Sequence, residues 1–205
     1  MSTKKEAIPI AKKIVKDVLN GEKNLSEVYD ALTAKKEAIR YPNAIAIQTL
    51  SEEIPERIYP KFDYFVELTN SDNAFHRSIG LSAIANLTKV DTEKKFEKIF
   101  DKYFDLIDDK SLMVARQLTM VSGKIIKNKQ NLREKIVNKL LNIDKTHHDP
   151  NRSALIWGDI VEAFNENFEK LKDKKKILEF VNNQLQSASP TTIKKAKSFL
   201  KKWGE

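Results

Sequence analysis

The chain has 205 residues, of which 40% are hydrophobic and none is cysteine. This length and hydrophobic content allow a sizeable buried core, and the absence of cysteine excludes disulfides, thiol catalysis and zinc–thiolate sites. The formal net charge of +8 arises mainly near the C-terminus, because residues 170–202 carry ten lysines against two acidic residues.

Only 5 glycines and 6 prolines are present, and apolar residues recur every three or four positions, which indicates an all-helical protein with short loops. No segment shows sustained alternation of apolar and polar residues, so strands are not expected. No run reaches the roughly 18 apolar residues of a membrane span, and the N-terminus lacks the apolar core of a secretory signal. We therefore expect a soluble, cytoplasmic protein.

The N-terminal third contains several helical stripes. The first stripe ends near Gly21, and the second runs from Leu25 to Ile39. A third helix is expected to begin after Pro42, and Pro60 is expected in the first turn of a helix that carries Phe62 and Phe65.

From about residue 70 the chain repeats a two-helix pattern. Three first helices are predicted in the segments "SDNAFHRSIGLSAIANL", "DDKSLMVARQLTMVSGKII" and "HHDPNRSALIWGDIVEAF". A basic residue lies early in each, at Arg77, Arg116 and Arg152, and Lys194 holds this place in a final half unit, with spacings of 39, 36 and 42 residues. A period of about 40 residues made of two helices predicts an α-solenoid.

The pattern resembles HEAT repeats, whose first helix commonly begins Asp-x-x-x-x-Arg followed by alanines and leucines. Asp72 to Arg77, then Ala83, Ala85 and Leu87, fit this pattern best. The resemblance covers roughly residues 40–203. It implies an all-α, right-handed α-α superhelix of about eleven helices, a HEAT-like (armadillo-type) solenoid. We expect a single domain over residues 1–205, with a helical hairpin cap at 1–40 and repeats at 41–203.

Three glycines, Gly80, Gly123 and Gly158, fall inside predicted first helices. Glycine in a helix interior costs about 1 kcal/mol relative to alanine. Close approach of neighbouring helices would offset this cost, so these positions are predicted helix–helix contacts.

The stretch His147, His148 and Asp149 has two interpretations. As a metal or acid–base site it needs further ligands, and the adjacent histidines are expected to point apart. As a helix start it needs none, because Asp149 can cap a helix whose first residue is Pro150, as Asp72 and Ser189 can cap theirs. We favour the helix start and predict no metal ligand.

Trp157 and Asp159 raise a second alternative. Some HEAT-like proteins are alkylpurine DNA glycosylases, which hold a damaged nucleotide against aromatic residues near a carboxylate. Trp157, Asp159 and Trp203 could serve this scheme. No local motif of those enzymes is present, so Trp157 is predicted to pack and Asp159 to be solvated or paired within its repeat.

The C-terminal lysines are the strongest surface signal. Helical spacing exposes Lys194, Lys195, Lys197, Lys201 and Lys202 while Phe199 and Leu200 pack. Such a patch can bind phosphate or an acidic protein, or it can simply solvate the terminal repeat.

These patterns predict a non-enzymatic protein-binding scaffold, because no phosphate loop, His-Glu-x-x-His or nucleophile elbow is present. The alternative is a DNA-binding or glycosylase-like HEAT protein. No catalytic residue, cofactor or metal is predicted, a protein partner is favoured, and nucleic acid remains the alternative through the basic C-terminus. Predicted binding residues lie on helices near 92–108, 130–144 and 170–187 and at the C-terminus: Lys95, Lys98, Lys102, Arg133, Lys135, Lys139, Lys175, Lys194, Lys195, Lys201 and Lys202.

Overall fold

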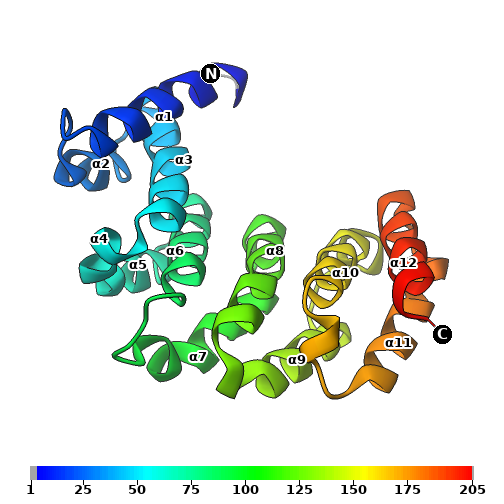
Figure 1. Cartoon of the computed structure of the whole chain (residues 1–205). Coiled ribbons are helices and arrows are strands. Elements are labelled where there is room, and N and C mark those ends of the chain that lie inside the picture. The colour runs from blue at the N-terminus through cyan, green and yellow to red at the C-terminus, as the bar shows by residue number, and fades with distance from the viewer. Residues whose placement is uncertain (1–3, 205) are drawn as a thin grey trace. The chain divides into compact units, whose positions relative to one another are not determined.

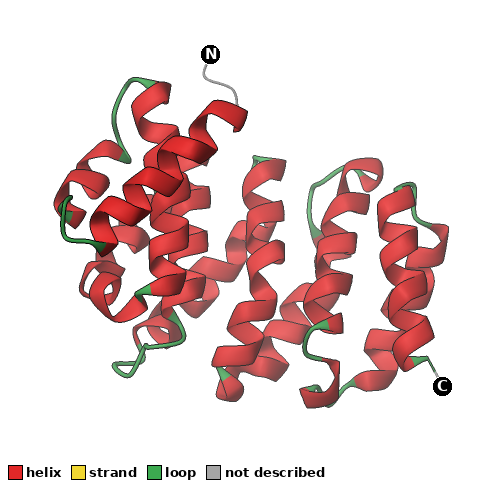
Figure 2. Cartoon of the chain, turned by 45° about the horizontal axis from the view of Figure 1, so that its top comes forward, coloured by secondary structure: helices red, strands yellow, loops and turns green. Residues whose placement is uncertain are grey.

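The computed structural model describes residues 4–204, without the side chains of residues 4, 5, 150 and 152. Within this range only helices, turns and loops occur, so the predicted all-α class is confirmed (Figure 2). Twelve α-helices, one of them a single turn, lie in the described range, and neighbouring helices pack against one another within each of the two units described below. The chain forms two compact units, one ending at Glu93 and the other beginning at Lys94.

The N-terminal unit contains six α-helices among its described residues and one 3-10 turn. They are α1 (Lys4–Leu19), α2 (Leu25–Ala31), α3 (Glu37–Glu53), α4 (Pro55–Ile58), the turn η1 (Tyr59–Lys61), α5 (Phe62–Thr69) and α6 (Ala74–Leu87). Helices α1 and α2 both pack on α3, which in turn packs on α6. The boundary predicted near residue 40 therefore falls inside this unit.

Two predicted helix boundaries in this unit are wrong. Helix α3 begins at Glu37, so Ile39 belongs to it rather than to α2, and Pro42 lies inside the helix. A proline in a helix interior removes one backbone hydrogen bond. Here the helix continues through Pro42, whose side chain is buried with those of Ala46, Ile47 and Leu50.

The start of α6 also differs from the prediction by one residue. Asn73, not Asp72, is the N-cap, and its side chain accepts a hydrogen bond from the backbone nitrogen of Phe75 at 2.9 Å. The Arg77 guanidinium donates to the carbonyl oxygens of Ser71 at 2.7 Å and Asp72 at 2.9 Å. The Asp-x-x-x-x-Arg pattern thus brings an arginine onto the backbone of the preceding loop.

The C-terminal unit has two rows of helices. One row contains α8 (Leu112–Asn128), α10 (Pro150–Asn165) and α12 (Pro190–Trp203), with α10 packed on both neighbours. The other row contains α7 (Lys95–Asp105), α9 (Arg133–Leu141) and α11 (Lys174–Asn183) (Figure 1). Single 3-10 turns connect the rows: η2 (Leu106–Asp108), η3 (Gln130–Leu132), η4 (Ile143–Lys145), η5 (Phe168–Lys170) and η6 (Gln184–Gln186).

The three helix-interior glycines mark close helix approaches, as predicted. A Cβ atom on Gly80 would lie 2.6 Å from the carbonyl oxygen of Phe65 on α5. On Gly123 it would lie 3.3 Å from the Cα atom of Ala163 on α10, and on Gly158 it would meet the Thr192 side chain on α12. In the C-terminal unit these contacts bring the helices of the first row together, nearly backbone to backbone.

Candidate functional site

A groove of about 610 Å³ lies between α7 and α9 in the C-terminal unit. This volume falls within the range of about 300–1,000 Å³ that is typical of ligand-binding pockets. The groove is lined by residues of α7, η2, α9, η4 and the turns beside them: Phe100, Asp101, Phe104, Asp105, Ile107, Asp108, Lys135, Asn138, Lys139, Asn142, Lys145 and Thr146.

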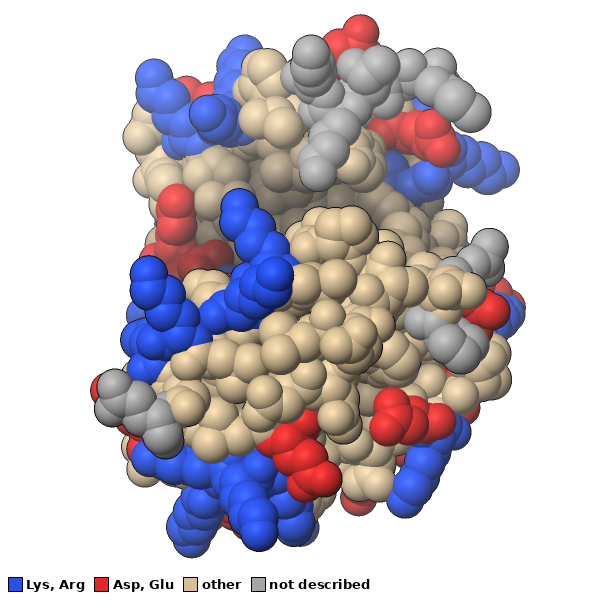
Figure 3. All heavy atoms as spheres, turned by 90° about the vertical axis from the view of Figure 1, so that its right-hand side faces the viewer, with Lys and Arg blue, Asp and Glu red and all other residues tan. Residues whose placement is uncertain are grey.

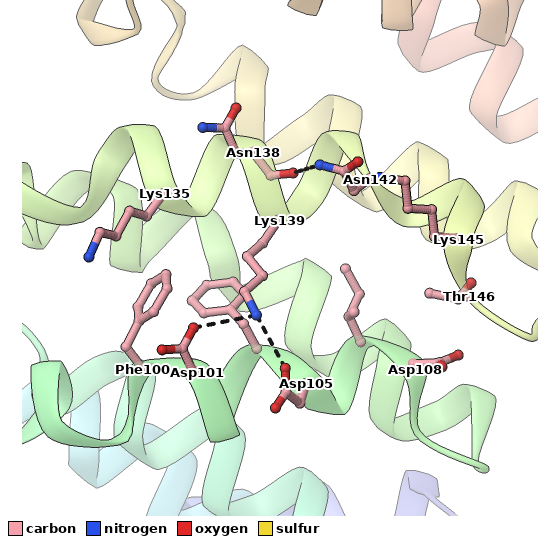
Figure 4. Close-up of a pocket in the computed structure, with 12 residues that line it drawn as sticks. Phe100, Asp101, Asp105, Asp108, Lys135, Asn138, Lys139, Asn142, Lys145 and Thr146 are labelled. Carbon is pink, nitrogen blue, oxygen red and sulfur yellow. Dashed lines mark hydrogen bonds and ion pairs between the residues drawn. The ribbon is translucent and has the colours of Figure 1, made fainter.

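Opposite charges face each other across this groove. Asp101, Asp105 and Asp108 lie on α7 and η2, and Lys135, Lys139 and Lys145 lie on α9 and η4. Lys139 reaches across from α9, with its Nζ atom 3.2 Å from Oδ1 of Asp105 and 3.5 Å from Oδ1 of Asp101 (Figure 4). The groove can therefore pair with both the acidic and the basic side chains of a segment of mixed charge.

The remaining lining is apolar or amide-bearing. Phe100, Phe104 and Ile107 are buried, at 6%, 0% and 8% exposure, so they form the apolar part of the lining. Asn138 on α9 and Asn142, the C-cap of that helix, add exposed amides, and the Asn142 amide nitrogen donates to the carbonyl oxygen of Asn138 at 2.7 Å. Buried rings beside polar, hydrogen-bonding groups are characteristic of surfaces that bind proteins or small molecules.

Of the predicted binding residues on this layer, Lys135 and Lys139 line the groove. Lys98, Lys102 and Lys175 are exposed elsewhere and Lys95 is half-buried, whereas the Arg133 Nε atom donates to the carbonyl oxygen of Ile126 at 2.9 Å. Sequence reasoning missed the acidic row. Its spacing of four and three residues, Asp101 to Asp105 to Asp108, is a helical-face signal that could have revealed it.

The C-terminal lysines divide into two groups. Lys194, Lys201 and Lys202 are exposed as predicted, whereas Lys195 is half-buried and its Nζ atom lies 3.5 Å from Asp159 and 3.8 Å from Glu162. The prediction that Lys195 is exposed is therefore wrong, because its ammonium group pairs with the Asp159 carboxylate of α10. On the C-terminal face, basic side chains gather along one edge and at the bottom, with uncharged atoms between them (Figure 3).

Trp157, Asp159 and Trp203 lie in three different environments. Asp159 is only 6% exposed and accepts a hydrogen bond from the Arg116 Nε atom of α8 at 2.9 Å, so it is neither solvated nor paired within its repeat. Trp203 donates through Nε1 to the Asn165 side chain at 2.9 Å. Trp157 lines a smaller pocket of about 400 Å³ beside Phe180 and Gln184, and its buried Nε1 atom has no hydrogen-bond partner.

The predicted helix start at Asp149 is confirmed. Helix α10 begins at Pro150, and Asp149 Oδ1 accepts from the Asn151 backbone nitrogen at 2.9 Å. Ser189 likewise caps α12 by accepting from the Thr192 backbone nitrogen. The prediction that His147 and His148 point apart is wrong, because their ring centroids lie 4.3 Å apart.

Both histidines contact the turn η2. His147 donates from its backbone nitrogen, at 2.8 Å, and from Nδ1, at 2.6 Å, to Oδ1 of Asp108. The backbone hydrogen bond is the main reason that the pKa of Asp108 lies below its ordinary value, and the His147 side chain lowers it further. Asp108 thus links one end of the groove to the loop before α10.

Among the described residues, no helix is both long and apolar enough to span a membrane. No protein-family model matches the chain, and no curated protein matches it. The chain is similar to the crystal structure of an engineered protein, with a TM-score of 0.54 and 14% sequence identity, over 98% of this chain and 89% of that one. At this identity the similarity concerns the fold alone.

Proposed function

We propose that the chain is a non-enzymatic, HEAT-like scaffold that binds a segment of a partner protein in the groove between α7 and α9. The observation that supports this proposal most directly is the mixed charge of the groove over buried phenylalanines. A segment with an apolar residue flanked by acidic and basic residues would satisfy both rows and the apolar lining. Charge complementarity of this kind gives specificity and fixes register.

The same charges argue against a phosphate backbone as the ligand of this groove. Nucleic acid is bound by lysine and arginine side chains that replace its counterions, and carboxylates within reach oppose that binding. Three aspartates share the groove with three lysines. A protein partner is therefore favoured over nucleic acid at this site.

The test uses tryptophan substitutions at two exposed asparagines on second-row helices. Asn138→Trp on α9 places an indole in the groove, and Asn182→Trp makes the same change on α11, outside the groove lining. Cross-linking with the full chain as bait, followed by mass spectrometry, should identify proteins that are captured by wild type and Asn182→Trp. Asn138→Trp should lose them. Equal capture by both variants contradicts the proposal.

One observation favours the second candidate function, binding of DNA. Lys194, Lys197, Lys201 and Lys202 are exposed on α12. Fluorescence anisotropy with a labelled duplex at two salt concentrations tests this candidate, and changing these four lysines to glutamate is the matched variant. Lys195 is left intact because it pairs with Asp159. Salt-sensitive binding that the variant loses would move the proposal to nucleic acid, whereas absence of binding at low salt excludes it.

A further inference from the structure

Two loops of the C-terminal unit bring three metal-binding side chains together. Asp108 ends the turn η2, and His147 and His148 precede α10, 39 and 40 residues later in the chain. One ligand atom from each of the three residues lies within 4.8 Å of the other two. In a tetrahedral zinc site, bonds of about 2.0–2.2 Å place ligand atoms roughly 3.3 Å apart. The cluster is therefore close to the required size without any change of backbone.

The hydrogen bond of His148 favours metal binding by that ring. Its Nε2 atom lies 3.2 Å from the carbonyl oxygen of Ile107, and because a carbonyl only accepts, Nε2 carries the proton. The neutral ring then keeps its lone pair on Nδ1. Histidines that bind metals commonly donate their other ring N–H to a backbone carbonyl, which fixes the tautomer and the orientation of the ring.

A metal ion would bind between the side chains of His147 and Asp108, which are now in direct contact. Nδ1 of His147 lies 2.6 Å from Oδ1 of Asp108, with a proton between them. A cation that binds between the two atoms replaces that proton. If the His147 ring is neutral, the proton moves to its Nε2 atom, and if the ring is charged, the proton is released to solvent. Both side chains are about half exposed, at 54% and 49%, so they can separate by the roughly 0.7 Å that would bring the two atoms from 2.6 Å to the spacing of a zinc site.

We propose that Asp108, His147 and His148 bind one divalent transition-metal ion of the zinc type, with water in the remaining positions. Two imidazole nitrogens and one carboxylate oxygen suit zinc, nickel or copper, whereas magnesium and calcium prefer oxygen ligands. The ion joins the turn after α7 to the loop before α10, two parts of the chain that belong to successive repeats. This proposal does not depend on the protein-binding role of the groove.

The test is isothermal titration of the metal-stripped, full-length chain with zinc chloride, in protein without a polyhistidine tag. We expect one ion per chain. Cobalt(II) should give the visible absorption of a site with nitrogen ligands, and its NMR spectrum should show two shifted imidazole N–H signals. The His147→Ala/His148→Ala variant should lose the ion, and Asp108→Asn should bind it at least about tenfold more weakly.

The matched control is His76→Ala, because His76 on α6 is the remaining histidine of the chain and lies in the N-terminal unit. This variant should bind zinc as the wild type does. Circular dichroism of the metal-free variants checks that each retains the wild-type helix content. Undetectable zinc binding by the wild type at millimolar zinc overturns the proposal, and so does unchanged affinity in the folded double-histidine variant.

Discussion

Gly80 shows how a single missing side chain sets the distance between two helices. A Cβ atom there would lie 2.6 Å from the Phe65 carbonyl oxygen and 3.1 Å from the Thr69 backbone nitrogen of α5. Backbone atoms inside a helix cannot move aside as a flexible side chain can. The cost of overpacking, typically 1–3 kcal/mol, therefore outweighs the gain of about 1 kcal/mol in helix propensity.

We therefore expect Gly80→Ala to lower the free energy of unfolding by about 1–2 kcal/mol, as measured by urea denaturation. Gly123→Ala is the matched control. Its added Cβ would chiefly meet the Glu166 carboxylate, the far end of a flexible side chain, and the nearest backbone atom lies 3.3 Å away. A loss at Gly123 as large as that at Gly80 would contradict the explanation from backbone contact.

His76 is the residue whose titration should be visible in stability. Burial lowers the pKa of His76 below its ordinary value of 6.5, and the nearby Arg40 charge lowers it further. The unfolded chain then takes up a proton at a higher pH than the folded chain, so stability falls as pH drops through about 6.5 and levels off below the folded pKa. In His76→Gln this part of the pH dependence should vanish. The measurement is the difference between variant and wild-type stability from pH 5 to 8, and parallel curves would refute the prediction.

At the scale of single residues, the sequence predicted caps and close contacts well where one local rule applies. Ser189 and Asp149 were recognised because serine or aspartate before proline is a strong helix-start signal. The cap of α6 was placed at Asp72 rather than Asn73 because both residue types suit that role. Local preference does not choose between adjacent candidates.

Among the helices, Asp159 links three neighbours in the first row through its charge. Its buried carboxylate on α10 accepts from Arg116 of α8 at 2.9 Å and from Lys195 of α12 at 3.5 Å. Three helices of one row therefore meet at one side chain. The sequence did not reveal this, since the partners lie 43 and 36 residues away and each could equally have faced solvent.

We expect Asp159→Asn to lower the free energy of unfolding by about 2 kcal/mol, because it removes the charge that both cations face. The cost stays below the 3–5 kcal/mol of a fully buried broken pair, since the Arg116 side chain is 35% exposed. Chemical denaturation of Asp159→Asn and the wild type measures this change in the free energy of unfolding. Asp105→Asn is the control, since its 68% exposed side chain pairs with Lys139 at the surface and should contribute less than about 1 kcal/mol. Equal losses of unfolding free energy in the two variants would show that the burial of Asp159 does not strengthen its ion pairs.

The predicted second-row helices near 92–108, 130–144 and 170–187 match α7, α9 and α11 together with their 3-10 turns. Periodicity was sufficient because each helix has one strongly apolar face, as with Phe96, Phe100 and Phe104 on α7. The groove was predicted only in part, through Lys135 and Lys139. Which residues of two helices face each other depends on how the helices pack, and periodicity within each helix does not determine that.

At the scale of the whole molecule, the division at Glu93 and Lys94 indicates two separate cores. The C-terminal unit contains fully buried residues of its own on both helix rows, among them Phe104, Ile125, Ile136 and Phe164. In repeat arrays each element depends mainly on its neighbours. We expect a fragment of residues 94–205 to fold alone, with helical circular dichroism and cooperative thermal unfolding. A fragment without cooperative unfolding would show that its core depends on the rest of the chain.

The close approach of α8 and α10 at Gly123 has a mechanical consequence. With a would-be Cβ only 3.3 Å from the Ala163 Cα atom, these two helices have little room to approach further. On the other row, α7 and α9 are separated by a groove of about 610 Å³. Bending of this part of the array therefore pivots at the glycine contact and is taken up by widening or narrowing the groove. A molecule bound in the groove would limit this narrowing and so set the curvature of the repeats around it.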